Sequence, residues 1–451
     1  MRSGVHHLTM FFPESMPANT LIGNLPVSTM ERTRCRGLVG VGLLMALWAM
    51  VAPASEIDAS IEHVHHLAPI SADLAWDELV EQALINYPHF VELSARDAEA
   101  RALAERARSW LSGQPSMLVR YQTDRFGQNN DLREYEMGLE LPLWRRGQRQ
   151  AARSLGAAAG SESEAAALAL RHELIGLLRM VLWEVERADN AVALAEDGIN
   201  TATELVRVVE RRYEAGDLPL SDTLLVRSTK LEREAVLIES EAMLVDAHRA
   251  YLSLSGLDVR PSDYVESLSA LENLNPSHPW LLLADAELDR ARANLELVHR
   301  AVRGTPTLTL APRRERASFS DFDADSIGIT VAIPFGGQAH KGVETAAVAR
   351  EVAEAEAERA ELLRQLDIDL HEARHSLVVI DASLELARER NDLAAESLRM
   401  GEIAFGQGEI TLFELLRWDE SARVAQREAE SLEIERQRAI AQVNQAIGEW
   451  P

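Results

Sequence analysis

The sequence predicts a mainly α-helical chain with a small membrane-embedded β part, in which long helices pair as coiled-coil hairpins. One order of elements, helix, strand, strand, very long helix, turn and helix, occurs twice. Two helical segments run for roughly 70 residues without an internal proline, which corresponds to about 105 Å of helix. Aromatic residues make up only 5% of the 451 residues. Such a composition is typical of long helices rather than compact globules.

Residues 1–54 have the pattern of a secretory leader. Arginines at positions 32, 34 and 36 precede an apolar run over 38–51, and Ala52-Pro53-Ala54 supplies a small-x-small cleavage site. We expect the mature chain to begin near residue 55. Residues 1–29 then either precede the true start of translation at Met30 or form the beginning of an unusually long leader.

Cysteine and charge exclude several classes of protein. Cys35 is the only cysteine and precedes the apolar run, so no disulfide or lipid anchor is expected. Removing four Arg and two acids with the leader changes 46 basic and 72 acidic residues to 42 and 70, a net charge of −28. This charge disfavours nucleic acid. It fits a cation-tolerant conduit or the solvated surface of a helical periplasmic protein.

The segment 55–71 is expected to be a flexible N-terminal tail. It carries His63, His65 and His66, whose imidazoles are weak candidates for metal ligands. The alternative is a tail without a ligand. No nucleophile triad, phosphate-binding glycine loop or CxxC pattern occurs, so we expect no enzyme activity and no cofactor.

An internal repeat organises the rest of the chain. Pro88 and Pro279 each open a helical stretch, 279 − 88 = 191 residues apart, and the tight-turn glycines Gly216 and Gly408 are 408 − 216 = 192 apart. A period of this length indicates a chain built from two copies of one structural unit. The predicted parts are repeat 1 over 72–260, a linker over 261–275 and repeat 2 over 276–451.

Each repeat is predicted to contain one strand pair: about 116–125 with 134–143, and about 307–316 with 326–335. Tyr135, Met137, Leu139 and Leu141 alternate with polar or small residues. Strands of about ten residues fit a tilted membrane span. A soluble hairpin or a sandwich edge would alternate similarly. Four strands cannot close a barrel in lipid, so closure would require further copies, and three copies would supply twelve strands.

The helices following the strands are predicted at 146–215 and 339–407. An apolar seam on the first has coiled-coil spacing: Leu170, Leu174, Leu177, Val181, Val185, Ala188 and Val192. Segments 220–254 and 412–447 are about half as long. Each long helix therefore needs a second short partner, which 76–111 and 279–302 provide.

This order resembles the outer-membrane efflux protein family of TolC-like ducts, including its heavy-metal branch, over residues 72–450. The resemblance rests on Leu141-Pro142-Leu143-Trp144, on Ile333-Pro334-Phe335 and on the two turns that end in Gly216 and Gly408. It implies an α-barrel of helical hairpins in the periplasm and a homotrimeric, twelve-stranded β-barrel in outer-membrane lipid. It also implies a periplasmic adaptor (membrane fusion protein) and an inner-membrane pump as partners.

The resemblance assigns two groups of site residues. Acids six residues past each tip glycine, Asp222 and Glu414, would line the periplasmic aperture, although Arg417 departs from the further acid that some members carry. The alternative is that both are first-turn acids favoured by the helix dipole. The adaptor-docking tips would be Ala215, Gly216, Asp217, Leu218, Gln407, Gly408, Glu409 and Ile410.

The predicted function is a passive exit duct of a tripartite efflux system, with heavy-metal cations favoured over drugs as cargo. The alternatives are a periplasmic adaptor or coiled-coil interaction protein, a type I protein-secretion exit duct and an autonomous porin-like channel.

Overall fold

The computed structural model describes residues 67–127, 129–335 and 338–451, with side chains described from 342 onward in the last range. These residues belong to one compact unit that spans 63–451. The predicted leader and the histidines at 63, 65 and 66 lie outside the described residues.

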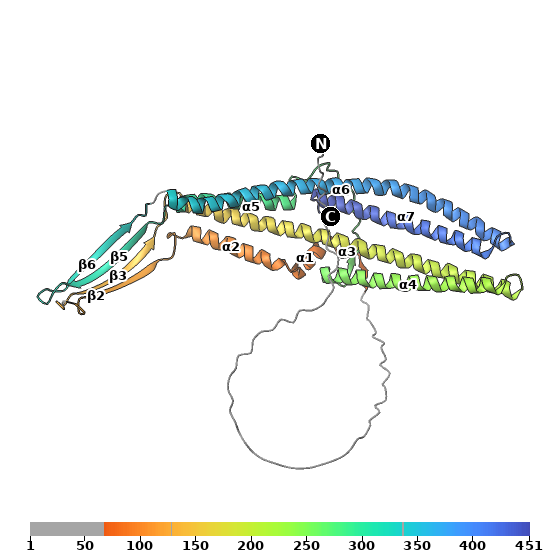
Figure 1. Cartoon of the computed structure of the whole chain (residues 1–451), viewed down its shortest axis with the longest axis horizontal. Helices are drawn as coiled ribbons and strands as arrows, with labels where there is room; N and C mark the ends of the chain where they lie inside the picture. The colour runs from red at the N-terminus through yellow and green to blue at the C-terminus, as the bar shows by residue number, and fades with distance from the viewer. Residues whose placement is uncertain (1–66, 128, 336–337) are drawn as a thin grey trace, which may run out of the picture. The chain divides into compact units, whose positions relative to one another are not determined.

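In the described residues the expected order of elements occurs twice, and these two halves are called the first and second repeat (Figure 1). The elements of the first repeat are β1 (Ile70–Ser71), α1 (Trp76–Asn86), α2 (Phe90–Arg108), β2 (Ser116–Thr123), β3 (Arg133–Pro142), α3 (Gln148–Glu214) and α4 (Leu220–Ser255). A two-residue strand β4 (Arg260–Pro261) leads into the second repeat. Its elements are α5 (Pro279–Ala301), β5 (Thr307–Arg316), β6 (Ala324–Ala332), α6 (Gln338–Gln407) and α7 (Leu412–Ile447).

The predicted helix over 76–111 is wrong as a single element, because it is broken between α1 and α2. Tyr87 has an extended backbone, with φ −76° and ψ 129°. A residue before proline is disfavoured in the α conformation, and Pro88 cannot donate a helical hydrogen bond. Pro88 thus precedes α2 as predicted, and it also ends α1.

The predicted flexible tail is wrong over residues 68–71. Strand β1 pairs in parallel with β4, so that Ile70 lies opposite Arg260. Ala68 is buried, and its backbone N–H donates to Nδ1 of His248 at 3.2 Å. These contacts fasten the first described residues to α4 and to the segment that follows it.

Three of the strands differ from their predicted bounds by one to three residues. Strand β2 ends at Thr123 because Asp124 organises the following turn, where its carboxylate accepts from the N–H groups of Asn130 and Leu132 at 2.7 and 3.0 Å. Strand β6 starts at Ala324 and ends at Ala332 rather than running over 326–335.

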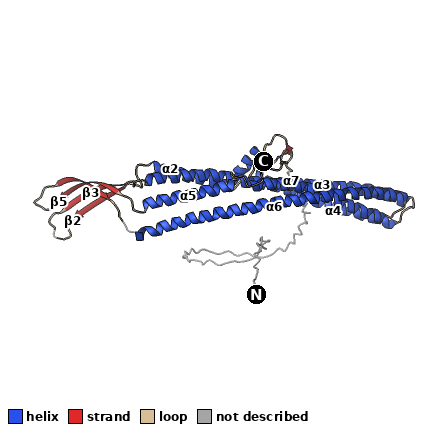
Figure 2. Ribbon diagram, turned by 90° about the horizontal axis from the view of Figure 1, so that it is seen from above, coloured by secondary structure: helices blue, strands red, loops and turns tan. Residues whose placement is uncertain are grey.

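Each long helix is shared by shorter partners, as predicted from their lengths. Helix α3 packs against α4 over one part of its length and against α2 and α5 over the other (Figure 1). Helix α6 likewise packs against α7 and α5 (Figure 2). The predicted seam is too narrow, because α3 also buries Ile175, Leu178 and Leu182 where it meets several helices at once.

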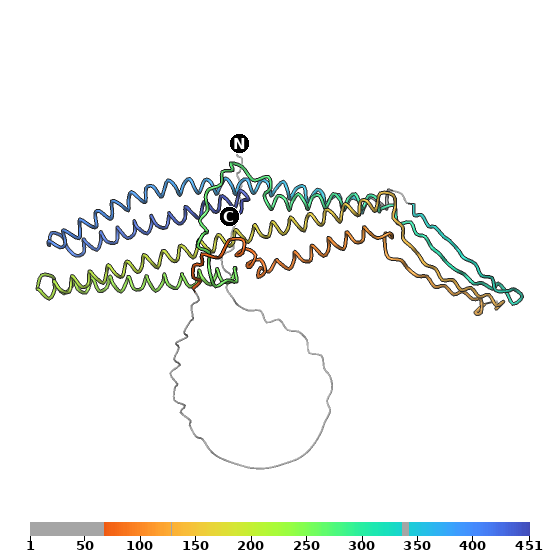
Figure 3. Tube along the Cα trace, turned by 180° about the vertical axis from the view of Figure 1, so that it is seen from behind, coloured from red at the N-terminus to blue at the C-terminus, as the bar shows by residue number. Residues whose placement is uncertain are grey.

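A buried polar joint fastens the two repeats to each other near the middle of α3. Arg179 is 4% exposed, and its Nε and Nη2 each donate to the Glu266 carboxylate of the linker at 2.7 Å. Asn444 of α7 donates to the same carboxylate at 2.9 Å. Buried charges need such complete pairing, since an unpaired one costs several kcal/mol, on the order of 3–5. The traces of the two repeats meet at this linker in Figure 3.

Two fully buried histidines lie beside this joint. The rings of His172 on α3 and His278 before α5 have centroids 4.9 Å apart, and both pack on Trp280. Burial lowers the pKa of His172 to about 3, with further lowering by His278 and Arg179. Burial also lowers the pKa of His278 to about 4. Both imidazoles are therefore neutral in the fold at physiological pH.

This pair predicts an acid-sensitive joint. The unfolded chain takes up protons below its ordinary histidine pKa of 6.5, whereas the fold does not until about pH 4 to 3. Stability present above pH 6.5 is thus lost as the pH falls, by about 2 kcal/mol per histidine between pH 7 and 5. The pair together therefore accounts for a loss of about 4 kcal/mol, and denaturant unfolding at these two pH values should show only about 2 kcal/mol of it in His172→Gln, which keeps His278. The exposed His299→Gln variant serves as control, and an unchanged pH dependence in His172→Gln would contradict the assignment.

Candidate functional site at the helix tips

The two helix-to-helix turns have the same backbone geometry. Gly216 and Gly408 have φ values of +83° and +76°. The N–H of Asp217 donates to the carbonyl of Arg212 at 2.8 Å, and the N–H of Glu409 donates to that of Ala404 at 2.9 Å. This is a helix C-terminal motif in which glycine avoids the strain of the left-handed region. The repeat seen in the sequence is therefore, at the tips, a repeat of one turn.

The two predicted aperture acids occupy equivalent positions with different contacts. Glu414 forms a capping box with Thr411: its carboxylate accepts from the Thr411 N–H at 2.9 Å, and the Thr411 hydroxyl accepts from the Glu414 N–H at 3.3 Å. The hydrogen bond from the Thr411 backbone lowers the pKa of Glu414. Asp222 accepts from the Ser221 hydroxyl at 3.4 Å. Glu414 is exposed and ionised, so its cap leaves its charge open to solvent.

The two tips pack on each other through a small apolar cluster. Val209, Val226, Phe405, Leu412 and Leu415 are its buried members. Of the eight predicted docking residues, Leu218 and Ile410 pack against this cluster, which gives them a part in holding the tips. The other six are exposed: Ala215, Gly216, Asp217, Gln407, Gly408 and Glu409. The exposed surface of the tips is thus mostly backbone, glycine and two carboxylates.

An arginine that the sequence analysis missed joins the tips. Arg212 donates through Nη1 to the carbonyl of Phe405 at 2.8 Å. Its guanidinium lies 4.9 Å from the centroid of the Phe405 ring, a cation–π distance. No sequence signal distinguished Arg212 from its neighbours on α3. The aromatic residue could have been suspected, since Phe405 is the repeat counterpart of Tyr213.

At the other end of the helices, four antiparallel strands form one sheet in the order β2-β3-β5-β6. The registers place Met117 opposite Leu139, Leu139 opposite Leu310, and Leu310 opposite Ile329. These residues are 37–70% exposed and share one apolar face. The predicted alternation is confirmed, except that Leu141 is buried near the helices.

The opposite face of the sheet is polar. Arg313 pairs with Glu134 across strands at 3.1 Å, and Arg120 lies 3.8 Å from Glu136. Tyr121 and Tyr135 stack at 4.9 Å on the apolar face near the loop end. One apolar and one polar face, with aromatic residues toward an end of the apolar band, is the pattern of strands in an outer-membrane barrel.

Other site types find no support in the part of the chain that the structure describes. Within residues 67–127, 129–335 and 338–451 there is no grouping of three or more His, Cys, Asp or Glu side chains suited to a metal ion. Within the same ranges, no helix combines the length and apolar character needed to cross a bilayer.

Comparison with known proteins shows a shared fold at low sequence identity. No family model and no curated protein matches the sequence. The structure of the outer membrane protein VceC from Vibrio cholerae is 18% identical with a TM-score of 0.66, over 83% of this chain and 96% of that one. The structure of a membrane protein from Pseudomonas aeruginosa is also 18% identical, with a TM-score of 0.66, over 84% of this chain and 97% of that one.

The CmeC outer membrane channel of Campylobacter jejuni is 15% identical with a TM-score of 0.64, over 82% of this chain and 85% of that one. The chain therefore has the fold of TolC-like outer-membrane channels, as the resemblance implied.

The contact between the tips predicts a local effect of Arg212→Ala. Losing a charge-assisted hydrogen bond costs about 1.5 kcal/mol, so amide hydrogens over 405–410 should exchange roughly ten times faster. Hydrogen exchange resolved by mass spectrometry measures this directly. The control is Arg211→Ala, whose guanidinium donates within its own helix to the carbonyl of Arg207. Equal exchange in the two variants would show that Arg212 does not hold the tips together.

Proposed function

We propose that this chain is one protomer of a ring-shaped outer-membrane exit duct that passively conducts substrate from the periplasm. The observation that carries the proposal concerns the sheet, the helices next to the sheet and the helices next to the tips. Each of these three parts ends at the same two sides of the chain, where, among the described residues, its outermost element has a neighbour on one side only. The sheet ends in β2 and β6. The helices next to the sheet pack in the order α2-α3-α5-α6, and those next to the tips in the order α4-α3-α7-α6.

Successive copies can therefore join edge to edge, with β2, α2 and α4 of one copy against β6 and α6 of the next. Two different edges make a heterologous contact, which closes into a ring when the rotation allows. A ring also removes the open sheet edges, which lipid does not tolerate. Three copies supply twelve strands, and the number three rests on similarity to TolC-like channels.

Exposed apolar stripes on the two edge helices support this joint. Helix α4 presents Leu224, Leu231 and Ile238, which are 58–67% exposed and seven residues apart. Helix α6 presents Met400, Leu393 and Leu386 at the same spacing, 52–68% exposed. A spacing of seven is that of a coiled-coil seam.

The two stripes also lie at matching distances from their tips. Leu224 follows Gly216 by as many positions as Met400 precedes Gly408. The same equality holds for Leu231 with Leu393 and for Ile238 with Leu386, because both stripes have the same spacing. If the tips of neighbouring copies lie at the same height, the two residues of each pair also lie at the same height. Helix α4 of one copy can therefore contact α6 of the next through these three pairs of apolar side chains.

The apolar face of the sheet fits acyl chains, and the polar face fits an aqueous lumen. The exposed carboxylates of Asp217 and Glu409 at the tips, together with Asp222 and Glu414, favour a periplasmic adaptor as docking partner and cations as cargo. Heavy-metal cations are the preferred cargo and drugs the alternative. A periplasmic adaptor role has less support, because the likeness is to outer-membrane channels and the membrane-length strands would lack a purpose.

The ring predicts that assembly depends on the stripes. Burying Leu393 stabilises each interface by about 2 kcal/mol, and Leu393→Lys replaces this contact with a charge buried among apolar side chains. The purified chain should therefore no longer form trimers, and it should lose its channel conductance in planar bilayers. Adding Leu231→Glu in the same chain should restore both, because the two charges would then face each other. Met180→Lys changes an exposed apolar residue on α3, away from the edges, and should assemble normally. Normal assembly of Leu393→Lys would refute this interface.

The aperture assignment predicts a role for charge in ion block. Glu414→Gln combined with Asp222→Asn keeps hydrogen-bonding side chains but removes the carboxylates, so block of single-channel current by divalent cations should weaken several-fold. Thr411→Ala is the control, since it removes the cap of α7, at about 1 kcal/mol, without removing a charge. If divalent cations block the double variant as strongly as the unaltered chain, both acids serve only to stabilise the start of their helices and do not line the aperture.

A further inference from the structure

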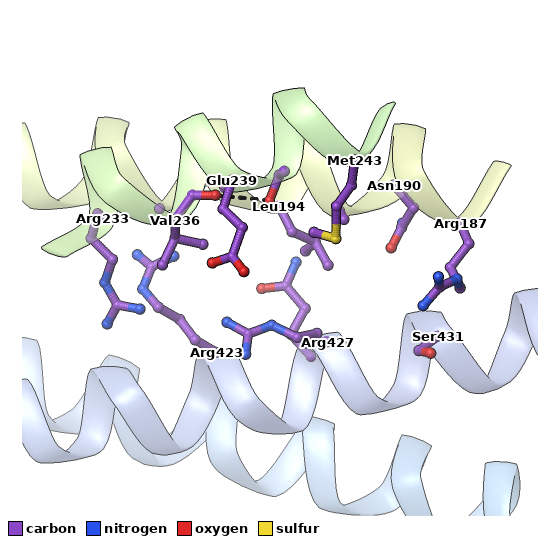
Figure 4. A pocket seen from close by; sticks show the side chains of 15 residues that line it. Arg187, Asn190, Leu194, Arg233, Val236, Glu239, Met243, Arg423, Arg427 and Ser431 are labelled. Carbon is purple, nitrogen blue, oxygen red and sulfur yellow. Dashed lines mark hydrogen bonds between the residues drawn. The ribbon is translucent and has the colours of Figure 1, made fainter. Parts of the chain in front are cut away.

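A cavity of about 320 Å³ lies where the α3–α4 hairpin faces α7 (Figure 4). It is separate from the tips, since Arg423 on its wall lies about 22 Å along the helix from Gly408. Part of its lining is apolar and comes from Leu194 on α3 and from Val236 and Met243 on α4. Its volume is within the range of small-molecule sites.

Four arginines line this cavity, in a chain whose net charge is −26. Two of them are fixed in its wall. Arg233 and Arg423 are only 14% and 11% exposed, and both contact the carboxylate of Asp419, at 3.3 and 3.1 Å. Arg233 also pairs with Glu420 at 2.6 Å. Their guanidinium groups are therefore held in place before any ligand arrives, which lowers the entropy lost on binding.

The other two arginines of the lining are more exposed to solvent. Arg187 pairs with Glu184 on its own helix and is 51% exposed. Arg427 is exposed and makes no hydrogen bond or ion pair with any residue that the structure describes. Figure 4 shows its side chain directed into the cavity from α7, beside that of Arg423.

Glu239 is the acidic residue in the lining of the cavity. Figure 4 shows its carboxylate extending from α4 into the space in front of Arg423 and Arg427. Its side chain has no hydrogen bond or ion pair among the described residues. An incoming anion would compete with this carboxylate for the same guanidinium groups.

We propose that this cavity binds an organic anion with an apolar body, of the aromatic carboxylate class. The carboxylate would face Arg423 and Arg427, because the guanidinium fork matches carboxylate geometry. The apolar body would lie on Leu194, Val236 and Met243, surface that inorganic phosphate would leave uncovered. Since α3, α4 and α7 all contribute, the ligand would bridge the hairpin of the first repeat to the second repeat.

The probe for this site is 1-naphthoate, titrated calorimetrically into the purified full chain in lipid nanodiscs. We expect saturable binding of one naphthoate per chain. Arg427→Gln should weaken it about ten-fold by removing the arginine that lacks a partner, whereas Glu239→Gln should tighten it several-fold by removing the competing carboxylate. Arg399→Gln, which removes an exposed arginine from α6, should bind like the unaltered chain.

Two comparison ligands complete the experiment: the neutral 1-naphthalenemethanol and inorganic phosphate. Equal binding of the neutral alcohol would overturn the role of the arginines, and equal binding of phosphate would overturn the role of the apolar lining. Indistinguishable affinities in Arg427→Gln, Glu239→Gln and the unaltered chain would place the binding elsewhere. Because conductance and assembly are not measured, either outcome leaves the proposed duct untouched.

Discussion

The length of the two central helices is the constraint on which the rest of the structure depends. Helix α3 has 67 residues and α6 has 70, whereas α4 and α7 have 36 each, and α2 and α5 have 19 and 23. A helix about 100 Å long presents an apolar stripe that no single short partner can cover. Two partners placed end to end do cover it, and they leave a gap in the middle where their ends meet.

That gap is filled by the linker and the buried joint. Tyr251 and Leu79 bring the ends of α4 and α1 against α3, while Arg179 and Glu266 tie the linker to it. The same arrangement leaves one long helix, α6, and the short helices α2 and α4 at the two free edges. The sheet repeats this asymmetry with β6 and β2 at its edges. The proposed ring would form through these unpaired edges, without a separate oligomerisation element among the described residues.

Much of the fold could be predicted because it depends on local patterns. The long segments without proline predicted α3 and α6. The alternation of apolar and polar residues predicted the apolar face of the sheet, and the glycines of the two turns predicted the tips. Contacts between distant segments left no such pattern. The anchoring of Ala68 by His248 and the contact of Arg212 with Phe405 join residues 180 and 193 positions apart. The tip acids were found by position, but the capping role of Glu414 depends on backbone geometry that sequence alone does not show.

The edge-to-edge ring is tested most directly by cysteine cross-linking. With Cys35 replaced by serine, a chain carrying Leu231→Cys and Leu393→Cys places one thiol on each edge, equally far along the sequence from its own tip glycine. Oxidation in native outer membranes should give covalent dimers and trimers and nothing larger, since a closed ring of three exhausts its edges. Monomers alone, or a ladder that continues beyond three, would contradict the account.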